Sequence, residues 1–353
     1  MSQGTKKIGI LTAGGDCPGL NAAIRGVGKT SILKYGMDVY GFSSGYLGLI
    51  NNEYRHLDEK SLSGILTMGG TILGTSREKP FKHEEYEEYV QSKPDRILEN
   101  CDKLGLDALV CIGGNGTMKT AGKLQELGLN IVGIPKTIDN DVWGTDMTFG
   151  FDTAVNIATE AIDRMHTTAN SHKRIMVVEV MGHHTGWLSL YSGVAGGGDA
   201  ILLPEIPWKA ETLKDYLLKR LEAGKPYSIV VVAEGVKVPG VGMKKNRISA
   251  GAAVARLIQD MTGIETRETI LGYIQRGGTP SPRDRVIATE LGSYAAGMAD
   301  SGEFGRMAAY HGNDLTSVPL EEVAGKTKFV PADHPLIKHA RTIDTCFGDG
   351  LGR

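Results

Sequence analysis

Short apolar runs alternate with amphipathic stretches along this chain, and that alternation limits its possible folds more than any other feature. The strands expected in the first half are Lys7–Thr12, Asp38–Phe42, Ala108–Ile112 and Asn130–Ile134. The helices expected between them are Asn21–Tyr35, Asp95–Leu104 and Thr117–Leu127. Strands that alternate with helices predict an α/β fold in which helices cover both faces of a parallel sheet.

The alternation restarts in the second half, after a helical pattern over residues 151–169. Three further strands are expected at Arg174–Val180, Ala200–Leu203 and Tyr227–Ala233. We therefore predict two lobes, each a mainly parallel sheet with helices on both faces. No Pro- or Ser-rich linker separates them, so we expect the chain to cross between the lobes more than once. The first lobe would consist of residues 1–150 and about 275–325, and the second lobe of residues 151–274 and about 326–353. The ending Gly348–Gly352 is interpreted as a mobile tail.

Composition excludes several kinds of partner. The formal net charge of −2 gives no general attraction to nucleic acid or anionic lipid, so anions must be bound by local clusters of Lys and Arg. The 4 cysteines have no metal-ligand spacing, and no apolar stretch approaches the roughly 20 residues of a membrane span. The amino terminus also lacks a signal-peptide pattern. We expect a cytoplasmic protein.

Ligands of such sheets gather beyond the carboxyl ends of the strands, where this chain places glycines and polar residues. The strand ends are Gly14–Gly19, Gly113–Thr117, Pro135–Asp141, Met181–His184, Glu234–Gly235 and Tyr273–Gly278. Paired glycines that lead into a helix expose backbone N–H groups and suit phosphate. Neither glycine turn of the first lobe has P-loop or dinucleotide-fold spacing, so glycines that only permit a tight turn remain an alternative.

The segment Thr137–Asp141 brings two carboxylates to one strand end. In an extended segment Asp139 and Asp141 face the same side. One carboxylate could then accept the proton of an attacking hydroxyl while the other helps to hold a metal ion. The alternative is an Asx turn that closes a solvated loop.

Single arginines follow or flank several strands and could bind phosphate. Arg77 follows a glycine-rich stretch, and Arg174, Arg267 and Arg276 lie at strand edges in the second half. Solvated surface positions are the alternative for each of them alone. The adjacent His183 and His184 are expected to point apart, so we do not expect them to bind metal.

The chain resembles the phosphofructokinase family over nearly its whole length, because seven of its segments match family motifs and follow each other in the family's order. They are GILTAGGDCPGLNAAIRG, GGTILGTSR, GGNGT, PKTIDND, VVEVMG, AEG and RETILGYIQRGG, the last followed by DR. The resemblance implies a glycolytic kinase with Mg²⁺ as cofactor. It would transfer the γ-phosphoryl group of ATP to the 1-hydroxyl of fructose 6-phosphate, giving fructose 1,6-bisphosphate and ADP. The first lobe would bind the donor and the second lobe the sugar.

The resemblance also implies roles for individual residues. The donor site would consist of Gly15, Tyr46, Arg77, Glu78, Gly114, Asn115, Gly116 and Thr117. Asp139 would be the general base, with Thr137 beside the transferring group and Arg77 stabilising its charge. Asn115 and Asp141 are the implied metal ligands. The sugar site would consist of Thr137, Asp139, Arg174, Met181, Gly182, His183, Glu234, Arg267, Tyr273 and Arg276.

Arg174 and Arg267 are implied to reach the 6-phosphate across a subunit boundary, which predicts a homo-oligomer, either a dimer or a tetramer.

Three positions depart from the best-known bacterial pattern. Asn115 replaces a carboxylate near the metal, His183 replaces an arginine, and Tyr273 replaces a histidine. Loss of the carboxylate removes one negative charge, although an amide oxygen can still bind Mg²⁺.

The phosphoryl donor depends on Gly116 and Lys136. Pyrophosphate-dependent relatives carry an acidic residue at the position of Gly116, where it would occupy the space needed for the α-phosphate of ATP. Glycine leaves that space open, which favours ATP, while Lys136 occurs with both donors. A pyrophosphate-dependent enzyme, an NAD or lipid kinase, and a non-catalytic sugar-phosphate or nucleotide sensor are the alternatives.

Overall fold

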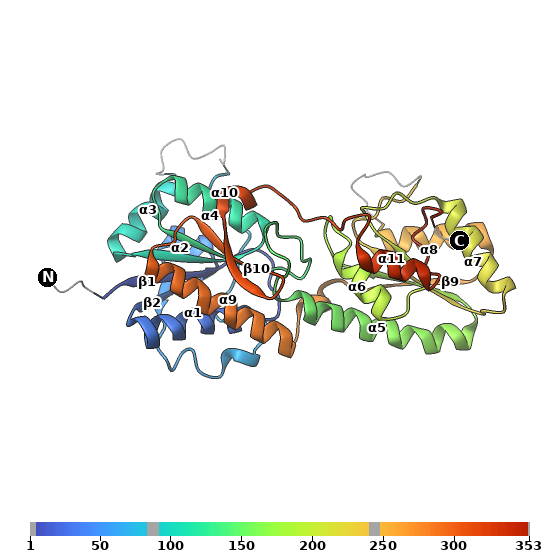
Figure 1. Cartoon of the computed structure of the whole chain (residues 1–353), viewed down its shortest axis with the longest axis horizontal. Coiled ribbons are helices and arrows are strands. Elements are labelled where there is room, and N and C mark those ends of the chain that lie inside the picture. The colour runs from blue at the N-terminus through green and yellow to red at the C-terminus, as the bar shows by residue number, and fades with distance from the viewer. Residues whose placement is uncertain (1–4, 83–91, 240–247, 352–353) are drawn as a thin grey trace. The chain divides into compact units, whose positions relative to one another are not determined.

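The computed structural model describes residues 5–82, 92–239 and 248–351 and divides into two compact units. Unit 1 consists of Met1–Thr137, Asp141–Asp152 and Arg276–Lys328. Unit 2 consists of Ile138–Asn140, Thr153–Gln275 and Phe329–Arg353 (Figure 1). The chain therefore passes between the two units several times.

Unit 1 is built on a mixed sheet that is parallel at its centre. In the described residues its strand order is β11-β10-β5-β4-β1-β2-β3. These strands are β1 (Lys7–Thr12), β2 (Asp38–Phe42), β3 (Tyr54–His56), β4 (Ala108–Gly113), β5 (Ile131–Pro135), β10 (Arg306–His311) and β11 (Asp314–Pro319). The edge strands β3 and β11 are antiparallel to their neighbours, whereas the pairs between β2 and β10 are parallel. The carboxyl ends of β1, β4 and β5 therefore share one edge.

Helices cover both faces of this sheet (Figure 1). They are α1 (Leu20–Tyr35), α2 (Tyr46–Asn51), α3 (Lys93–Leu104), α4 (Asn115–Glu126), α9 (Pro282–Ser301) and α10 (Leu320–Val323), with a short 3₁₀ turn η1 (Ile65–Thr67). Helices α1 and α9 approach closely because glycines face each other. A Cβ on Gly26 would stand 2.7 Å from the Thr289 carbonyl oxygen, and one on Gly292 would stand 2.6 Å from that of Ala23.

Unit 2 is built on a parallel sheet with the order β7-β8-β6-β9. Its strands are β6 (Ile175–Val180), β7 (Ala200–Leu202), β8 (Ser228–Ala233) and β9 (Thr266–Ile270). Its helices are α5 (Phe151–His172), which begins at the end of unit 1, α6 (Trp187–Ala195), α7 (Ala210–Glu222), α8 (Ala250–Thr262) and α11 (Pro335–Thr342), with a 3₁₀ turn η2 (Gly272–Arg276). Every residue of β6, β7 and β8 is buried, as expected for parallel strands covered on both faces.

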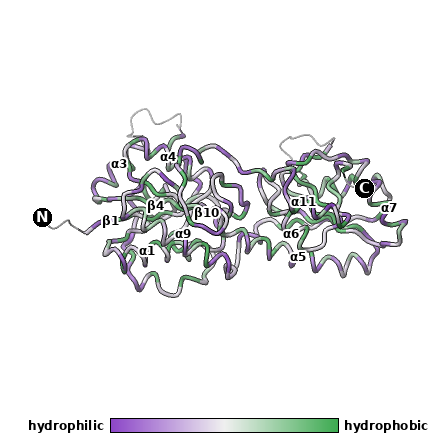
Figure 2. Tube along the Cα trace, viewed as in Figure 1, coloured by the Kyte–Doolittle hydropathy of each residue, from purple (hydrophilic) through white to green (hydrophobic). Residues whose placement is uncertain are grey.

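The predicted α/β class is confirmed, because each unit holds a mainly parallel sheet between helices. Figure 2 shows hydrophobic residues concentrated in the central strands, where continuous apolar runs gave the strand predictions. The hairpin β10–β11 was not predicted. Within the part of the chain that the structure describes, no helix has the length and apolar character needed to cross a membrane.

The expected mobile tail is wrong for the described residues up to Leu351. The Cys346 N–H donates to the Asp199 carbonyl oxygen at 3.0 Å, and the Ile201 N–H donates to that of Cys346 at 2.8 Å. Arg341 forms an ion pair with Asp349 at 2.6 Å. The segment therefore extends the edge of the unit 2 sheet beside β7. Gly352 and Arg353 lie outside the described residues.

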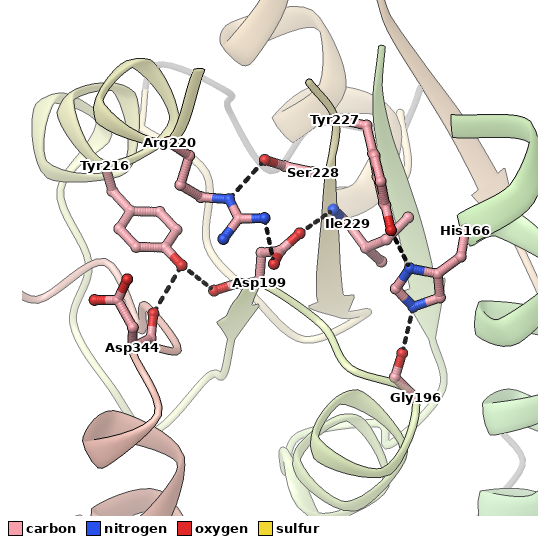
Figure 3. A network of polar contacts seen from close by, with 9 residues as sticks. All are labelled: His166, Gly196, Asp199, Tyr216, Arg220, Tyr227, Ser228, Ile229 and Asp344. Atoms are coloured by element: carbon pink, nitrogen blue, oxygen red, sulfur yellow. Dashed lines mark hydrogen bonds and ion pairs between the residues drawn. The ribbon is translucent and has the colours of Figure 1, made fainter. Parts of the chain in front are cut away.

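A polar network secures this docking at the amino ends of β7 and β8 (Figure 3). The Tyr216 hydroxyl on α7 lies 2.7 Å from the Asp344 carbonyl oxygen and 3.0 Å from that of Asp199. The Asp199 carboxylate pairs with Arg220 at 2.5 Å and accepts the Ile229 N–H at 2.9 Å. Burial raises the pKa of Asp199, and the Arg220 guanidinium is among the groups that oppose this shift.

We expect Arg220→Ala to lower the free energy of unfolding by about 3 kcal/mol, because it leaves the mostly buried Asp199 carboxylate without its ion-pair partner. The control is Arg164→Ala, which breaks an exposed pair with Glu160 and should cost less than about 0.5 kcal/mol. Denaturant unfolding of both variants measures the difference. Equal losses would contradict the structural role of the Asp199 pair.

Candidate active site

Three strand ends meet at the carboxyl edge of the unit 1 sheet. The Ala13 N–H beyond β1 donates to the Ile112 carbonyl oxygen of β4 at 3.0 Å, and the Lys136 N–H beyond β5 donates to that of Gly113 at 2.9 Å. The turns after β1 and β4 and the segment after β5 are thus hydrogen-bonded neighbours. This is the edge at which such sheets bind ligands.

The turn after β1 is held by the segment that carries Arg77. The Gly14 N–H donates to the Ser76 carbonyl oxygen at 2.9 Å, and the Thr75 hydroxyl donates to that of Gly14 at 2.7 Å. This pair of bonds places exposed Arg77 in the chain directly after the contact with Gly14. Sequence reasoning missed Thr75 and Ser76, although two hydroxyl residues directly before a candidate arginine are a recognisable signal.

Two cations lie at Gly15. The buried Lys136 ammonium donates to the Gly15 carbonyl oxygen, with 4% of the residue exposed. A Cβ on Gly15 would stand 1.8 Å from a guanidinium nitrogen of Arg276, so a larger residue here would displace that side chain from its position beside the turn. Arg276, which the resemblance assigned to the sugar site, belongs to unit 1 and lies beside this turn.

Helix α4 begins at the same edge without a side-chain cap or an acidic residue in its first turn. Its amino-terminal N–H groups and helix dipole therefore favour an anion. A Cβ on Gly116 would meet nothing within 4 Å, so this position is open. Thr117 and Tyr46 are buried, and the Tyr46 hydroxyl donates to the Thr117 carbonyl oxygen at 2.9 Å. Tyr46 thus anchors the first turn of α4 from inside the core.

Asn115 offers one atom suited to a metal ion. Its amide nitrogen donates to the carbonyl oxygen and the carboxylate of Asp141, both at 3.1 Å. Its Oδ1 atom is buried without a hydrogen-bond partner. An amide oxygen beside a carboxylate fits the preference of Mg²⁺ for oxygen ligands. The described residues contain no group of three or more His, Cys, Asp or Glu that could hold a metal by themselves.

Glu78 and Lys93 form an ion pair at 3.1 Å, and both side chains are largely buried. This carboxylate, which the resemblance placed in the donor site, is therefore already matched by a cation.

The segment that carries Asp139 and Asp141 is turned and not extended. Asn140 has a φ of 51°, in the left-handed region, and the residues before it form a turn. The two carboxylates therefore do not share one side of an extended strand. The segment forms a turn, as the alternative had it, but Asn140 and Asp141 are buried and not solvated. Asp139 belongs to unit 2, whereas Asp141 belongs to unit 1. Asn tolerates this backbone region better than most residues.

In unit 2 a carboxylate organises the turn after β6. Oε1 of Glu234 accepts the N–H groups of His183 at 2.6 Å and Gly182 at 3.3 Å. The Met181 N–H donates to the buried Gln275 side chain at 3.3 Å. The Thr185 hydroxyl lies 3.4 Å from the Asp139 carbonyl oxygen and so links this turn to the segment of Asp139.

His183 and His184 lie against each other, with ring centroids 3.7 Å apart. The expectation that they point apart is wrong because His183 has a φ of 53°, which rotates successive side chains toward the same side. Both residues are exposed.

Arg174 and Arg267 lie together at the opposite end of the unit 2 sheet. Their guanidinium groups contact the same carboxylate oxygen of Glu265, at 3.3 Å and 2.7 Å. Arg174 precedes β6 and Arg267 lies at the start of β9, whereas Met181 follows β6 at its far end. Six strand residues span about 20 Å, so within one chain these arginines are remote from Gly182 and Glu234. Tyr273 is 75% exposed.

We expect Gly113→Ala to destabilise unit 1 by roughly 2 kcal/mol, because its Cβ would stand 2.2 Å from the Thr117 side chain in a packed region. Gly116→Ala is the control and should keep the wild-type free energy of unfolding, since its Cβ enters open space. Denaturant unfolding of both variants provides the test. A larger loss for Gly116→Ala would show that the turn is packed differently.

Comparison with known proteins agrees with this geometry. The family model described as Phosphofructokinase matches residues 7–299. The ATP-dependent 6-phosphofructokinase 3 of Bacteroides thetaiotaomicron is 58% identical, with 97% of this chain and 100% of that protein covered. The ATP-dependent 6-phosphofructokinase of Spirochaeta thermophila is 56% identical, with 98% and 99% covered. The crystal structure of Pichia pastoris phosphofructokinase in the T-state superposes with a TM-score of 0.80 at 36% identity, over 91% of this chain and 35% of that chain. This chain therefore belongs to the phosphofructokinase family.

Proposed function

We propose that this protein is an ATP-dependent 6-phosphofructokinase, a kinase of glycolysis. It transfers the γ-phosphoryl group of ATP to the 1-hydroxyl of D-fructose 6-phosphate and releases fructose 1,6-bisphosphate and ADP. The observation that carries the proposal is the buried Lys136 ammonium at Gly15, on the same sheet edge as the uncapped start of α4. The chain also matches ATP-dependent relatives over 99% or more of their length. We place this reaction in the cytoplasm.

The donor phosphates would lie along the carboxyl edge of the unit 1 sheet. The N–H groups at the start of α4 and the Lys136 ammonium supply positive potential there. The open space at Gly116 supports ATP over pyrophosphate, because the α-phosphate needs room that an acidic side chain would take. Arg77 would stabilise the charge of the transferring group, beside Thr137.

Mg²⁺ fits this edge as the cofactor. The residues that would hold it are Asn115, through its buried Oδ1 atom, and Asp141, through its carboxylate. When bound, the ion neutralises charge on the donor phosphates. Because an amide stands where a second carboxylate is usual, this chain supplies less negative charge than the common bacterial pattern.

Asp139 would accept the proton of the 1-hydroxyl as the hydroxyl oxygen attacks the γ-phosphorus atom. The bond from that phosphorus to the bridging oxygen of ADP breaks as the new bond forms. The Thr185 contact to the Asp139 carbonyl oxygen holds the base on the unit that carries Gly182 and Glu234. Glu234 in turn fixes the Gly182 turn, where the sugar is expected to bind.

Subunits would share the sugar site. Arg174 and Arg267 are remote from Glu234 within one chain, yet their guanidinium groups are gathered on one carboxylate and are suited to a phosphate. In a homo-oligomer they would reach the 6-phosphate bound by a neighbouring subunit. The proposal includes either a dimer or a tetramer.

We expect the purified protein with Mg²⁺ and fructose 6-phosphate to turn over with ATP and much more slowly with pyrophosphate. Gly116→Asp should lower kcat/KM for ATP more than about tenfold, because its carboxylate would repel the α-phosphate. Gly116→Ala serves as the control and should stay much closer to wild type. Coupled assays with each donor measure these values, and turnover with pyrophosphate alone would overturn the ATP assignment.

Asp139→Ala should lower kcat by roughly 100-fold or more, because the general base is lost, while fructose 6-phosphate still binds. Steady-state kinetics and calorimetric titration with the sugar separate the two effects. A near-normal kcat would remove Asp139 from the role of general base.

Mixed oligomers test the shared site. Arg267→Ala and Glu234→Ala should each inactivate the protein. Co-refolding equal amounts of the two should restore about a quarter of wild-type activity, because about half of the dimers are then hybrids and one of the two sites in each hybrid is intact. The control mixture combines Arg174→Ala with Arg267→Ala and should stay inactive, since each site then receives a damaged arginine pair. No recovery in the first mixture, with hybrid formation shown by mass spectrometry, would contradict shared sites.

A further inference from the structure

The segment from Met68 to Arg77 carries a candidate catalytic arginine but contains no helix or strand. Backbone polar groups in such a segment need partners outside regular secondary structure. Three of them are bound by one side chain, Asn21, near the start of α1. Its amide nitrogen donates to the carbonyl oxygens of Met68 at 3.1 Å and Gly69 at 3.3 Å, and its oxygen accepts the Ile72 N–H at 2.7 Å.

Asn21 is nearly fully buried, with 1% of the residue exposed, so water cannot readily replace these bonds. A side-chain amide supplies two donors and an acceptor in one plane, which a carboxylate or a hydroxyl cannot. Aspartate would have the same shape, but its carboxylate would face two carbonyl oxygens without a proton to donate. The chemistry of this position is therefore specific to an amide.

The turn that Asn21 binds continues into the donor edge of unit 1. The Thr71 hydroxyl lies 3.0 Å from the Thr12 hydroxyl at the end of β1, and Thr12 donates to the Gly74 carbonyl oxygen at 2.7 Å. Residues Thr75 and Ser76 then bind Gly14, as described above. The segment is thus fixed at Asn21 and at β1, and Arg77 follows directly.

We propose that Asn21 is a positioning residue for phosphoryl transfer, which holds the segment 68–76 so that Arg77 is presented to the transferring phosphoryl group. This inference rests on the proposed function, because Arg77 must stabilise the transition state for its position to matter. Asn21 itself touches neither substrate nor reacting atoms. Its effect should appear in kcat more than in the KM for fructose 6-phosphate, since Arg77 acts on charge in the transition state.

The test compares Asn21→Asp and Asn21→Ala with Asn100→Ala. Asn100 is a matched control because its amide donates to the carbonyl oxygens of Leu49 at 2.9 Å and Ile50 at 3.1 Å in the same unit, and neither bond involves the segment 68–76. Both Asn21 variants should lower kcat by roughly ten- to a hundred-fold, as small misplacements of a catalytic group do. Asn100→Ala should stay within about twofold of wild type.

A double-mutant cycle with Arg77→Ala separates positioning from general damage. If Asn21 acts through Arg77, Asn21→Asp should lower kcat in the wild-type background and barely change it in the Arg77→Ala background. Equal fold losses in both backgrounds, or an unchanged kcat in folded Asn21→Asp and Asn21→Ala, would overturn the inference.

Asn21→Gln keeps the amide and tests the proposal if Asn21→Asp and Asn21→Ala do not fold. Its kcat should exceed that of either of those variants, where that variant folds. The double variant Asn21→Gln with Arg77→Ala should have the same kcat as Arg77→Ala alone. A separate outcome concerns the proposed function. If wild-type protein fails to turn over, or Arg77→Ala leaves kcat unchanged, the kinase assignment or the role of Arg77 fails independently of Asn21.

Discussion

The buried ammonium of Lys136 is the constraint on which the donor side of this molecule depends. A charge with so little exposure must be met by polar groups, and the carbonyl oxygen of Gly15 is one of them. That bond ties the end of β5 to the turn after β1. The Lys136 N–H donates to the Gly113 carbonyl oxygen and so ties the end of β5 to β4 as well. The carboxyl ends of three parallel strands thus lie around the Lys136 ammonium, with the Arg276 guanidinium beside the same turn. A phosphate bound there would gain from the ammonium and from the uncapped start of α4.

The glycines at this edge differ in what surrounds them. At Gly15 a Cβ would collide with Arg276, and at Gly113 it would collide with Thr117, so both positions are filled by neighbouring side chains. Gly116 differs, because its Cβ would enter open space. The first two glycines allow close packing of neighbouring side chains, and the third leaves the open space in which we propose that the donor binds. In unit 2, a single carboxylate, Glu234, fixes the backbone of the turn to which the sugar is assigned.

The sequence predicted the α/β fold and many of its central elements, because continuous apolar strands and amphipathic helices are local patterns. It also predicted that glycines and polar residues gather at strand ends, and the family named by its motifs is confirmed. The contact of Arg276 with Gly15 and the docking of the carboxyl-terminal segment on Tyr216 were not predicted, and the turn at Asn140 was foreseen only as an alternative. Each depends on left-handed backbone or on contacts between residues far apart in the chain, which no local pattern records.

The proposed function requires transfer of the γ-phosphoryl group of ATP to the hydroxyl oxygen on carbon 1 of the sugar. Phosphorus NMR of the protein with Mg²⁺, ATP and fructose 6-phosphate tests it most directly. We expect the γ-phosphate resonance of ATP to fall while a second sugar-phosphate resonance, coupled to the protons of carbon 1, rises by an equal amount. Release of inorganic phosphate without a phosphate on carbon 1, or no consumption of ATP at all, would contradict it.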